Sequence, residues 1–236
     1  TSEHAESSVN FLADRQQQVD IELGINPPSQ GDYSLVYDGT TLYVDATDGQ
    51  NQFAWSADSP LEFQIDGVQF NVNEGTEKIH LRGAGGEDSV QLYGSSVDDI
   101  LHSTNGSVVL TTPGMKLVTS EIELVDVRME SGNDLVYLNG TEVDDSVTLS
   151  AAVANFVTSG LTLTVNGFER VVARESAGHD SVVFVDSAGD DRFYSYASHS
   201  LMVTGGLVLR ADRFDSVSGR SENGGWDTAA LHDSAG

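Results

Sequence analysis

Paired aspartates recur along the chain at a fixed distance. Asp98-Asp99, Asp144-Asp145 and Asp190-Asp191 follow one another at steps of 46 residues. Carboxylate oxygens are the ligands that calcium prefers in proteins. The candidate calcium ligands are therefore Asp144, Asp145, Asp190 and Asp191. The alternative is that these carboxylates accept hydrogen bonds from backbone amides in turns where strands begin.

A second set of aspartates recurs along the chain, eleven residues before the second aspartate of each pair. Asp180, for example, lies eleven residues before Asp191. Its members are Asp88, Asp134, Asp180 and Asp227, at spacings of 46, 46 and 47 residues. Each follows a small-residue stretch and precedes an apolar run, as in "AGHDSVVF". Calcium-binding solenoids repeat their motif about every nine residues, which neither step matches. The spacing therefore favours a structural turn ladder over calcium binding.

Enzymatic chemistry has one candidate stretch, "DDRFYSYASHS". Arg192, Tyr194 and Tyr196 alternate there, which places them on one face of a strand, and His199 follows. Parallel β-helices often carry polysaccharide lyases or glycoside hydrolases, which need either two carboxylates on one face or a Lys/Arg/Tyr/His cluster beside bound calcium. In so acidic a chain, carboxylate pairs arise from composition alone. We therefore expect an exposed aromatic stripe and a protein that is not an enzyme.

Composition limits the partners. The 236 residues include 37 acidic and 11 basic ones, for a formal net charge of -26. Nucleic acid and anionic lipid need Lys and Arg at the contact, so this chain should repel both. No apolar run approaches the roughly 20 residues of a membrane span. The chain has no cysteine, which excludes disulfides and thiolate metal sites.

Apolar residues form further ladders in the same register. Positions two and four after each anchor aspartate are apolar, and another apolar position recurs at steps of 46 residues. An alternation of period two predicts strands with one buried face. The expected core ladder consists of Ile79, Val125, Val171, Val217, Val90, Val136, Val182, Leu92, Leu138, Phe184 and Leu231.

Short strands, regular turns and a fixed period predict an all-β solenoid. A period of 46 residues divides into two coils of about 23, the size of one turn of a three-sided parallel β-helix. Each unit would lengthen the rod by about 10 Å. A β-propeller is the alternative, because its blades have about 40–45 residues.

The repeat divides the chain into three parts. Residues 1–30 are expected to form an arm or cap, and residues 31–66 a divergent first coil or hairpin. The solenoid proper covers 67–236. Its units run approximately over 67–113, 114–159, 160–205 and an incomplete 206–236.

Part of the repeat resembles a known family. "VNGFERVVAR" (165–174), "ESAGHDSVVFVDSAGDDRF" (175–193) and "GGWDTAALHDSAG" (224–236) are similar to repeats in giant secreted proteins of planctomycete bacteria. The resemblance covers about 67–236 and is strongest from Gly160 onward. It implies an extracellular β-helical or fibre-like region with a structural or adhesive role, and it brings no catalytic residues.

These observations lead to one expected function and two alternatives. We expect an extracellular or cell-surface structural protein, a segment or subunit of a fibre, stalk or adhesin. The chain begins at Thr1 rather than Met, and we expect that a leader has been removed or that the chain belongs to a longer protein. The expected partner is another copy of the repeat, with the 1–30 arm as one joint, and surface glycans are a further candidate. The alternatives are a calcium-dependent adhesive module and a carbohydrate-active enzyme.

Overall fold

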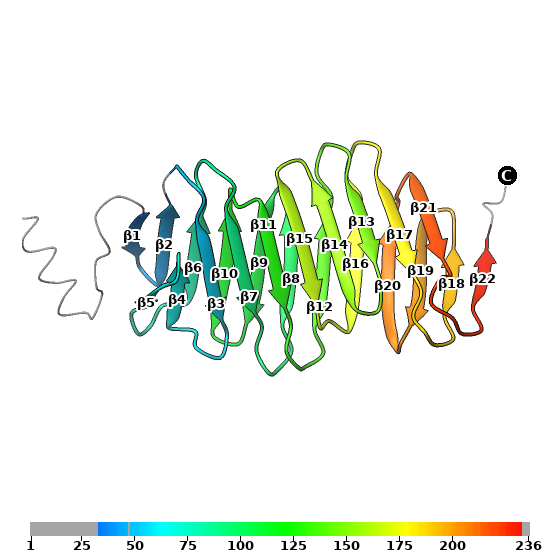
Figure 1. The fold of residues 1–236 in the computed structure, drawn as a ribbon, viewed down its shortest axis with the longest axis horizontal. Helices are drawn as coiled ribbons and strands as arrows, with labels where there is room; N and C mark the ends of the chain where they lie inside the picture. The colour runs from blue at the N-terminus through cyan, green and yellow to red at the C-terminus, as the bar shows by residue number, and fades with distance from the viewer. Residues whose placement is uncertain (1–32, 47, 233–236) are drawn as a thin grey trace, which may run out of the picture.

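The protein is an all-β solenoid whose strands stack along one long axis (Figure 1). The computed structural model describes residues 33–46 and 48–232, which form 22 strands and no helix. Within these residues, nothing has the form of an apolar membrane-spanning helix. The arm expected at residues 1–30 lies outside the described part of the chain.

Two sheets face each other along the length of the molecule. In spatial order, the 12-stranded sheet contains β1 (Tyr33–Asp38), β2 (Thr41–Ala46), β6 (Lys78–Arg82), β10 (Met115–Ser120), β9 (Ser107–Thr112), β8 (Ile100–Thr104), β12 (Leu135–Asn139), β16 (Arg170–Arg174), β20 (Leu207–Asp212), β19 (His199–Thr204), β18 (Arg192–Ser195) and β22 (Thr228–Leu231). The ten-stranded sheet contains β21 (Ser216–Arg220), β17 (Ser181–Val185), β13 (Ser146–Leu149), β14 (Val153–Thr158), β15 (Leu161–Asn166), β11 (Leu124–Arg128), β7 (Ser89–Tyr93), β3 (Gln52–Ser56), β4 (Glu62–Ile65) and β5 (Val68–Asn71). A propeller is excluded, because its sheets form separate blades around an axis.

The 46-residue unit has the same strand order each time, but it begins in alternate sheets. One unit runs from β7 in the ten-stranded sheet through the β8–β9–β10 meander in the other sheet and returns in β11. The next unit starts with β12 in the 12-stranded sheet and places its meander, β13–β14–β15, in the opposite sheet. Successive anchor aspartates therefore alternate between the two sides of the rod.

The solenoid prediction is confirmed, but the coil dimensions were wrong. Ile100 pairs in parallel with Leu135, 35 residues later, and Lys78 pairs with Lys116, 38 residues later. The coil is thus longer than 23 residues and has two sides rather than three. The cause is the antiparallel meander in each unit. In the β8–β9–β10 meander, the first turn has Asn105 and Gly106 at φ 49° and 74°, the left-handed conformations of a tight hairpin.

A single apolar core lies between the sheets. Strands alternate between buried and exposed side chains, and the largest buried residues include Trp55, Phe156 and Phe184. At the N-terminal end, Phe70 packs on Tyr33 and Phe63, with ring centroids 5.2 and 5.1 Å apart. Aromatic side chains thus close this end of the described core.

The expected core ladder is buried at nine of its eleven positions. The buried members are Ile79, Val125, Val171, Val90, Val136, Val182, Leu92, Leu138 and Phe184. The expectation of burial is wrong for Val217 and Leu231, which are 37% and 76% exposed. They lie on β21 and β22, the last strands of their sheets, where no further described strand covers them.

Candidate functional site

The two members of each aspartate pair serve different loops. The first member is exposed, and its Oδ1 accepts an amide hydrogen bond from the next coil. Asn133 donates to Asp98 at 2.9 Å, and His179 donates to Asp144 at 2.8 Å. In the third pair, the Trp226 amide donates to Asp190 at 2.9 Å.

The second member is buried and closes its own turn. Asp145 accepts the amide of Thr141 at 2.6 Å and its hydroxyl at 3.1 Å. Ser187 donates to Asp191 in the same way, at 2.6 and 3.1 Å. Neighbouring residues in extended chain point to opposite sides, so the two carboxylates of a pair do not converge. The two carboxylates of a pair thus act in separate turns, and calcium binding at Asp144, Asp145, Asp190 and Asp191 stays a prediction.

The anchor aspartates link successive coils. Oδ1 of Asp88 accepts the Asn51 amide at 2.8 Å, Oδ1 of Asp134 accepts the Asp99 amide at 2.7 Å, and Oδ1 of Asp180 accepts the Asp145 amide at 2.8 Å. These bonds cross 35 to 37 residues of sequence. Each carboxylate therefore holds the start of a strand in the preceding coil.

A ladder of acids that the sequence analysis missed completes this network. Glu123, Glu169 and Asp215 accept the amides of Asp88, Asp134 and Asp180 at 2.7, 2.6 and 2.9 Å. The three acids stand 46 residues apart, so the repeat itself carried the signal.

The three buried anchors differ in how fully their carboxylates are paired. Asp88, Asp134 and Asp180 are at most 1% exposed. Oδ2 of Asp88 and of Asp134 makes no hydrogen bond, whereas the Asp180 carboxylate accepts a second backbone hydrogen bond, from Ser176. Burial raises the pKa of all three carboxyls, and it raises the pKa of Asp134 to about 6. Amide hydrogen bonds oppose the shift, whereas neighbouring acids such as Glu169 add to it. Among the described residues, these three are the acids whose pKa is raised above its ordinary value.

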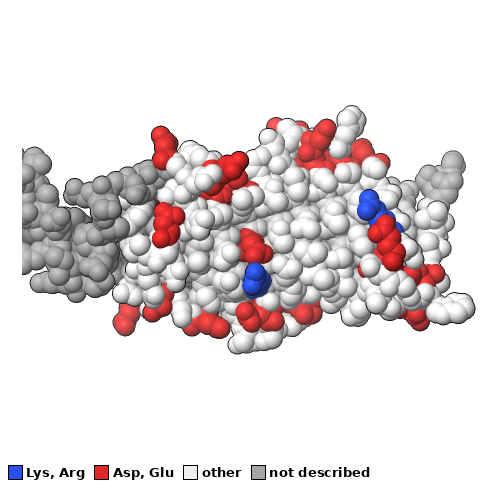
Figure 2. Space-filling model, in the orientation of Figure 1, with Lys and Arg blue, Asp and Glu red and all other residues white. Residues whose placement is uncertain are grey.

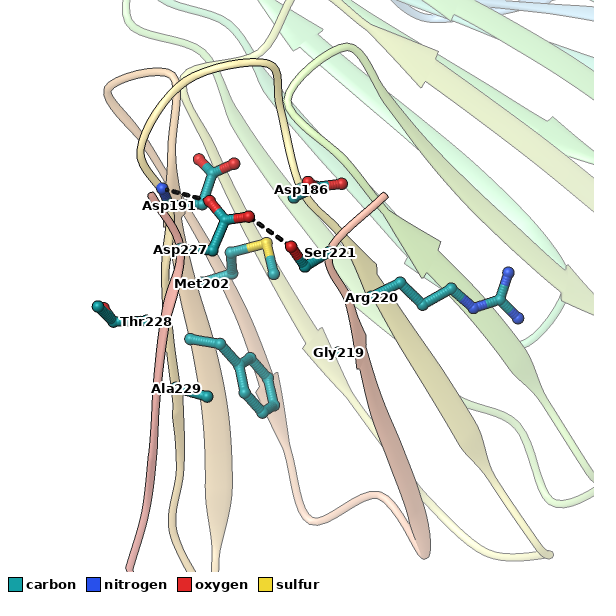
Figure 3. Close-up of a pocket in the computed structure, with 10 residues that line it drawn as sticks. Asp186, Asp191, Met202, Gly219, Arg220, Ser221, Asp227, Thr228 and Ala229 are labelled. Atoms are coloured by element: carbon teal, nitrogen blue, oxygen red, sulfur yellow. Dashed lines mark hydrogen bonds between the residues drawn. The ribbon is translucent and has the colours of Figure 1, made fainter. Parts of the chain in front are cut away.

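The fourth anchor, Asp227, lines a small cavity at the C-terminal end of the rod (Figure 3). Its Oδ1 accepts the Asp191 amide at 3.0 Å, and its Oδ2 accepts the Ser221 hydroxyl. The cavity has a volume of about 190 Å³, and Met202 and Ala229 form part of its apolar wall. It is an opening at the end of the core rather than a groove along the rod.

Asp186, at the rim of the same cavity, is fully engaged by the loop that follows β21. Burial raises its pKa, but amide hydrogen bonds from Glu222 and Asn223, at 3.0 and 2.8 Å, outweigh this effect. The pKa of Asp186 therefore lies below its ordinary value. Its carboxylate acts as a structural acceptor at this corner.

Two groups of three acids are close enough to share a metal ion. They are Glu175, Asp180 and Asp215, and Asp186, Asp191 and Asp227, with one oxygen from each residue within 4.8 Å of the others. Of the four candidate calcium ligands, the structure brings only Asp191 into such a group of described residues. Asp144, Asp145 and Asp190 belong to neither group.

The expected aromatic stripe is a stack of rings. Tyr196 lies between His199 and His232, with centroid distances of 4.6 and 4.5 Å. Arg192 is exposed and Tyr194 is half-buried. Asp191 precedes β18 and Tyr196 follows it, so this four-residue strand, about 13 Å long, separates the carboxylate from the rings. The acids and the stack thus do not form one catalytic arrangement.

No protein-family model, curated protein or solved structure matches this chain.

Proposed function

We propose that this chain is an extracellular structural module, a segment or subunit of a fibre, stalk or surface adhesin. The supporting observation is the open apolar end at β21 and β22. The two sheets continue in one direction through repeated coils, and each coil offers the next one the same set of partners. The extracellular placement rests on the resemblance to secreted repeat proteins.

The open end fits another coil of the same kind. Val217 and Leu231 occupy positions whose equivalents are buried in every preceding unit. The outer edges of β21 and β22 pair with no described strand, so their backbone groups are free to extend the sheets. Parallel registers already join the coils throughout the rod. The occupant that fits this surface is therefore another coil of the same repeat.

The sides of the rod suit a passive structural role. Side chains fill the space between the sheets, and main-chain hydrogen bonds join the coils along both sheets. The high negative charge keeps rods soluble and apart, and it discourages binding to nucleic acid or anionic membrane.

Electron microscopy and sedimentation of Leu231→Lys test the proposal. The parent chain should form end-to-end oligomers or filaments as its concentration rises. Leu231→Lys places a charge at the open end, so it should remain monomeric while keeping the β-sheet circular dichroism spectrum. The matched control is Val157→Lys, because Val157 is also exposed, at 44%, but lies on β14 in the middle of the rod.

Two results would overturn the end-to-end proposal. One is a parent chain that stays monomeric at every concentration reached. The other is a Leu231→Lys variant that assembles as well as the parent and the Val157→Lys control do.

A calcium-dependent adhesive module is a second candidate, favoured by the acidic group of Glu175, Asp180 and Asp215. Adhesion to glycans or to other copies would then depend on the ion. An adhesion assay on parent chain with calcium and with excess chelator distinguishes this role from that of a calcium-independent rod.

A further inference from the structure

The outer face of the 12-stranded sheet carries most of the basic residues of this acidic chain. Seven of the 11 lysines and arginines project from it, namely Lys78, Arg82, Lys116, Arg170, Arg174, Arg192 and Arg210. The same twelve strands contain only three acids, Asp38, Asp45 and Asp212, although the chain has 37. This face therefore has a surplus of positive charge on a chain whose net charge is -26.

Four of these cations form no ion pair with a described residue. Strand pairing places all four, Lys78, Lys116, Arg170 and Arg192, in one row of side chains along the rod. The row runs through Lys78, Lys116, Thr111, Ile100, Leu135, Arg170, Val208, Val203 and Arg192, each in register with the next. At the usual strand spacing it is about 40 Å long.

The two lysines of the chain are direct neighbours in this row. Lys78 of β6 pairs in register with Lys116 of β10. Like charges opposite each other on adjacent strands destabilise a sheet. No described carboxylate relieves the repulsion by an ion pair with either lysine. An anion bound to this face would do so.

A second row, two residues further along each strand, carries aromatic rings. His102 stacks on Tyr137 with ring centroids 4.7 Å apart. The guanidinium of Arg174 lies 5.3 Å from the centre of the Tyr137 ring, and that of Arg82 lies 5.4 Å from the centre of the Tyr43 ring. The rings thus hold two arginines on the surface, beside the row of unpaired cations.

The histidines of the second row lie in a positive environment. Burial lowers the pKa of His102, and the charges of Lys116 and Arg174 lower it further. Burial also lowers the pKa of His80, and Lys78 adds to the effect. The local potential on this face is therefore opposite in sign to the net charge of the chain.

We propose that the outer face of the 12-stranded sheet binds a linear acidic polysaccharide laid along the rod. Lysine and arginine bind carboxylate groups through charge-assisted hydrogen bonds, and tyrosine hydroxyls and imidazoles can hydrogen-bond to sugar hydroxyls. The length of the row suits an extended polymer. The proposal adds a binding role to one side of the rod and does not depend on end-to-end assembly.

The charge density of the face favours a polysaccharide over a nucleic acid. A nucleic acid strand has a charge about every 3.4 Å, so it would bring about twelve charges to a row 40 Å long. Only four unpaired cations stand in that row, and acidic loops border the sheet. A polyuronate has one carboxylate per sugar and therefore brings fewer charges to the same length.

Isothermal titration of the parent chain with polygalacturonate tests the proposal. The buffer contains EDTA, so that calcium cannot bridge carboxylates, and about 0.05 M KCl. The parent should show saturable binding that weakens as salt is added. The methyl ester of the same polymer has the same backbone without the charge, and it should bind at least about tenfold more weakly.

Two double variants assign the binding to this face. Arg170→Gln with Arg192→Gln removes two unpaired cations and should weaken binding of polygalacturonate at least about tenfold. The matched control is Arg128→Gln with Arg220→Gln, because these arginines are also exposed but belong to β11 and β21 of the ten-stranded sheet. This control makes the same change in net charge and should keep the parent's affinity. Circular dichroism checks that both variants are folded.

Four results would overturn the proposal. The first is no saturable binding of polygalacturonate by the parent. The second is equal binding of the neutral methyl ester. The third is an equal loss of affinity in the two double variants, which would indicate a response to net charge alone. The fourth is tighter binding of single-stranded oligothymidylate than of polygalacturonate, which would assign the face to nucleic acid. Filaments formed without any of this binding would leave the rod proposal standing.

Discussion

At the scale of single residues, Asp134 combines a structural role with an electrostatic cost. One of its oxygens accepts the Asp99 amide, whereas the other is buried without a partner. Burial raises its pKa from 3.8 to about 6, so the folded chain binds this proton more tightly than the unfolded chain does. The carboxyl therefore favours folding below about pH 4, and that contribution is lost as the pH rises through 6.

Asp134→Asn should reduce the loss of stability between pH 4 and pH 7. The amide keeps an oxygen for the Asp99 bond but has no charge to desolvate. The difference in unfolding free energy between the two pH values should become smaller than in the parent by about 1–3 kcal/mol. Urea unfolding at both pH values measures it. An identical pH dependence in the two proteins would show that Asp134 is not the responsible group.

At the scale of elements, the features that depend on local pattern were predictable. The period-two alternation identified core positions such as Val136 and Leu138, and the repeat identified the corner aspartates. The meanders were not foreseen, because β9 and β10 alternate just as parallel strands do and only their pairing differs. Similarly, Glu175 looked like an ordinary surface acid, since its neighbours Asp180 and Asp215 come from two different loops.

Glycine at the corners sets how closely two coils approach. Gly132 has φ 144°, and a Cβ there would lie 2.7 Å from the carbonyl carbon of Val97 in the preceding coil. Gly178 meets Val143 in the same way at the next corner, also at 2.7 Å. Because the obstacle is backbone, a side chain at either position must push the coils apart.

Gly132→Ala should lower the unfolding free energy by about 2–4 kcal/mol, because it adds a backbone clash to conformational strain. The matched control is Gly160→Ala, at φ 85° in a hairpin where a Cβ meets nothing within 4 Å. This variant has strain alone and should lose about 1–2 kcal/mol. Urea denaturation of both proteins gives the comparison. Equal losses would mean that contact between the coils does not limit stability at this corner.

At the scale of the whole molecule, repulsion between negative charges opposes the apolar contact that the open end favours. Acidic side chains gather mainly along the two long margins of the rod, where the loops connect the sheets, and few basic groups accompany them (Figure 2). Asp98, Asp144 and Asp190 are exposed corner residues of this kind. Joining two rods end to end adds their like charges, whereas the apolar end at β21 and β22 favours contact.

Ionic strength should therefore control the proposed assembly. With a net charge of -26 per chain, repulsion between rods is long-ranged at low salt. The screening length falls from about 30 Å at 0.01 M to about 8 Å at 0.15 M salt, while apolar burial at the joint persists. Sedimentation velocity at fixed protein concentration should show monomers in 0.01 M KCl and growing oligomers above 0.15 M. Leu231→Lys should stay monomeric throughout the series. If the oligomers instead dissociate as the salt concentration rises, ion pairs hold the rods together, and the apolar end is not the contact surface.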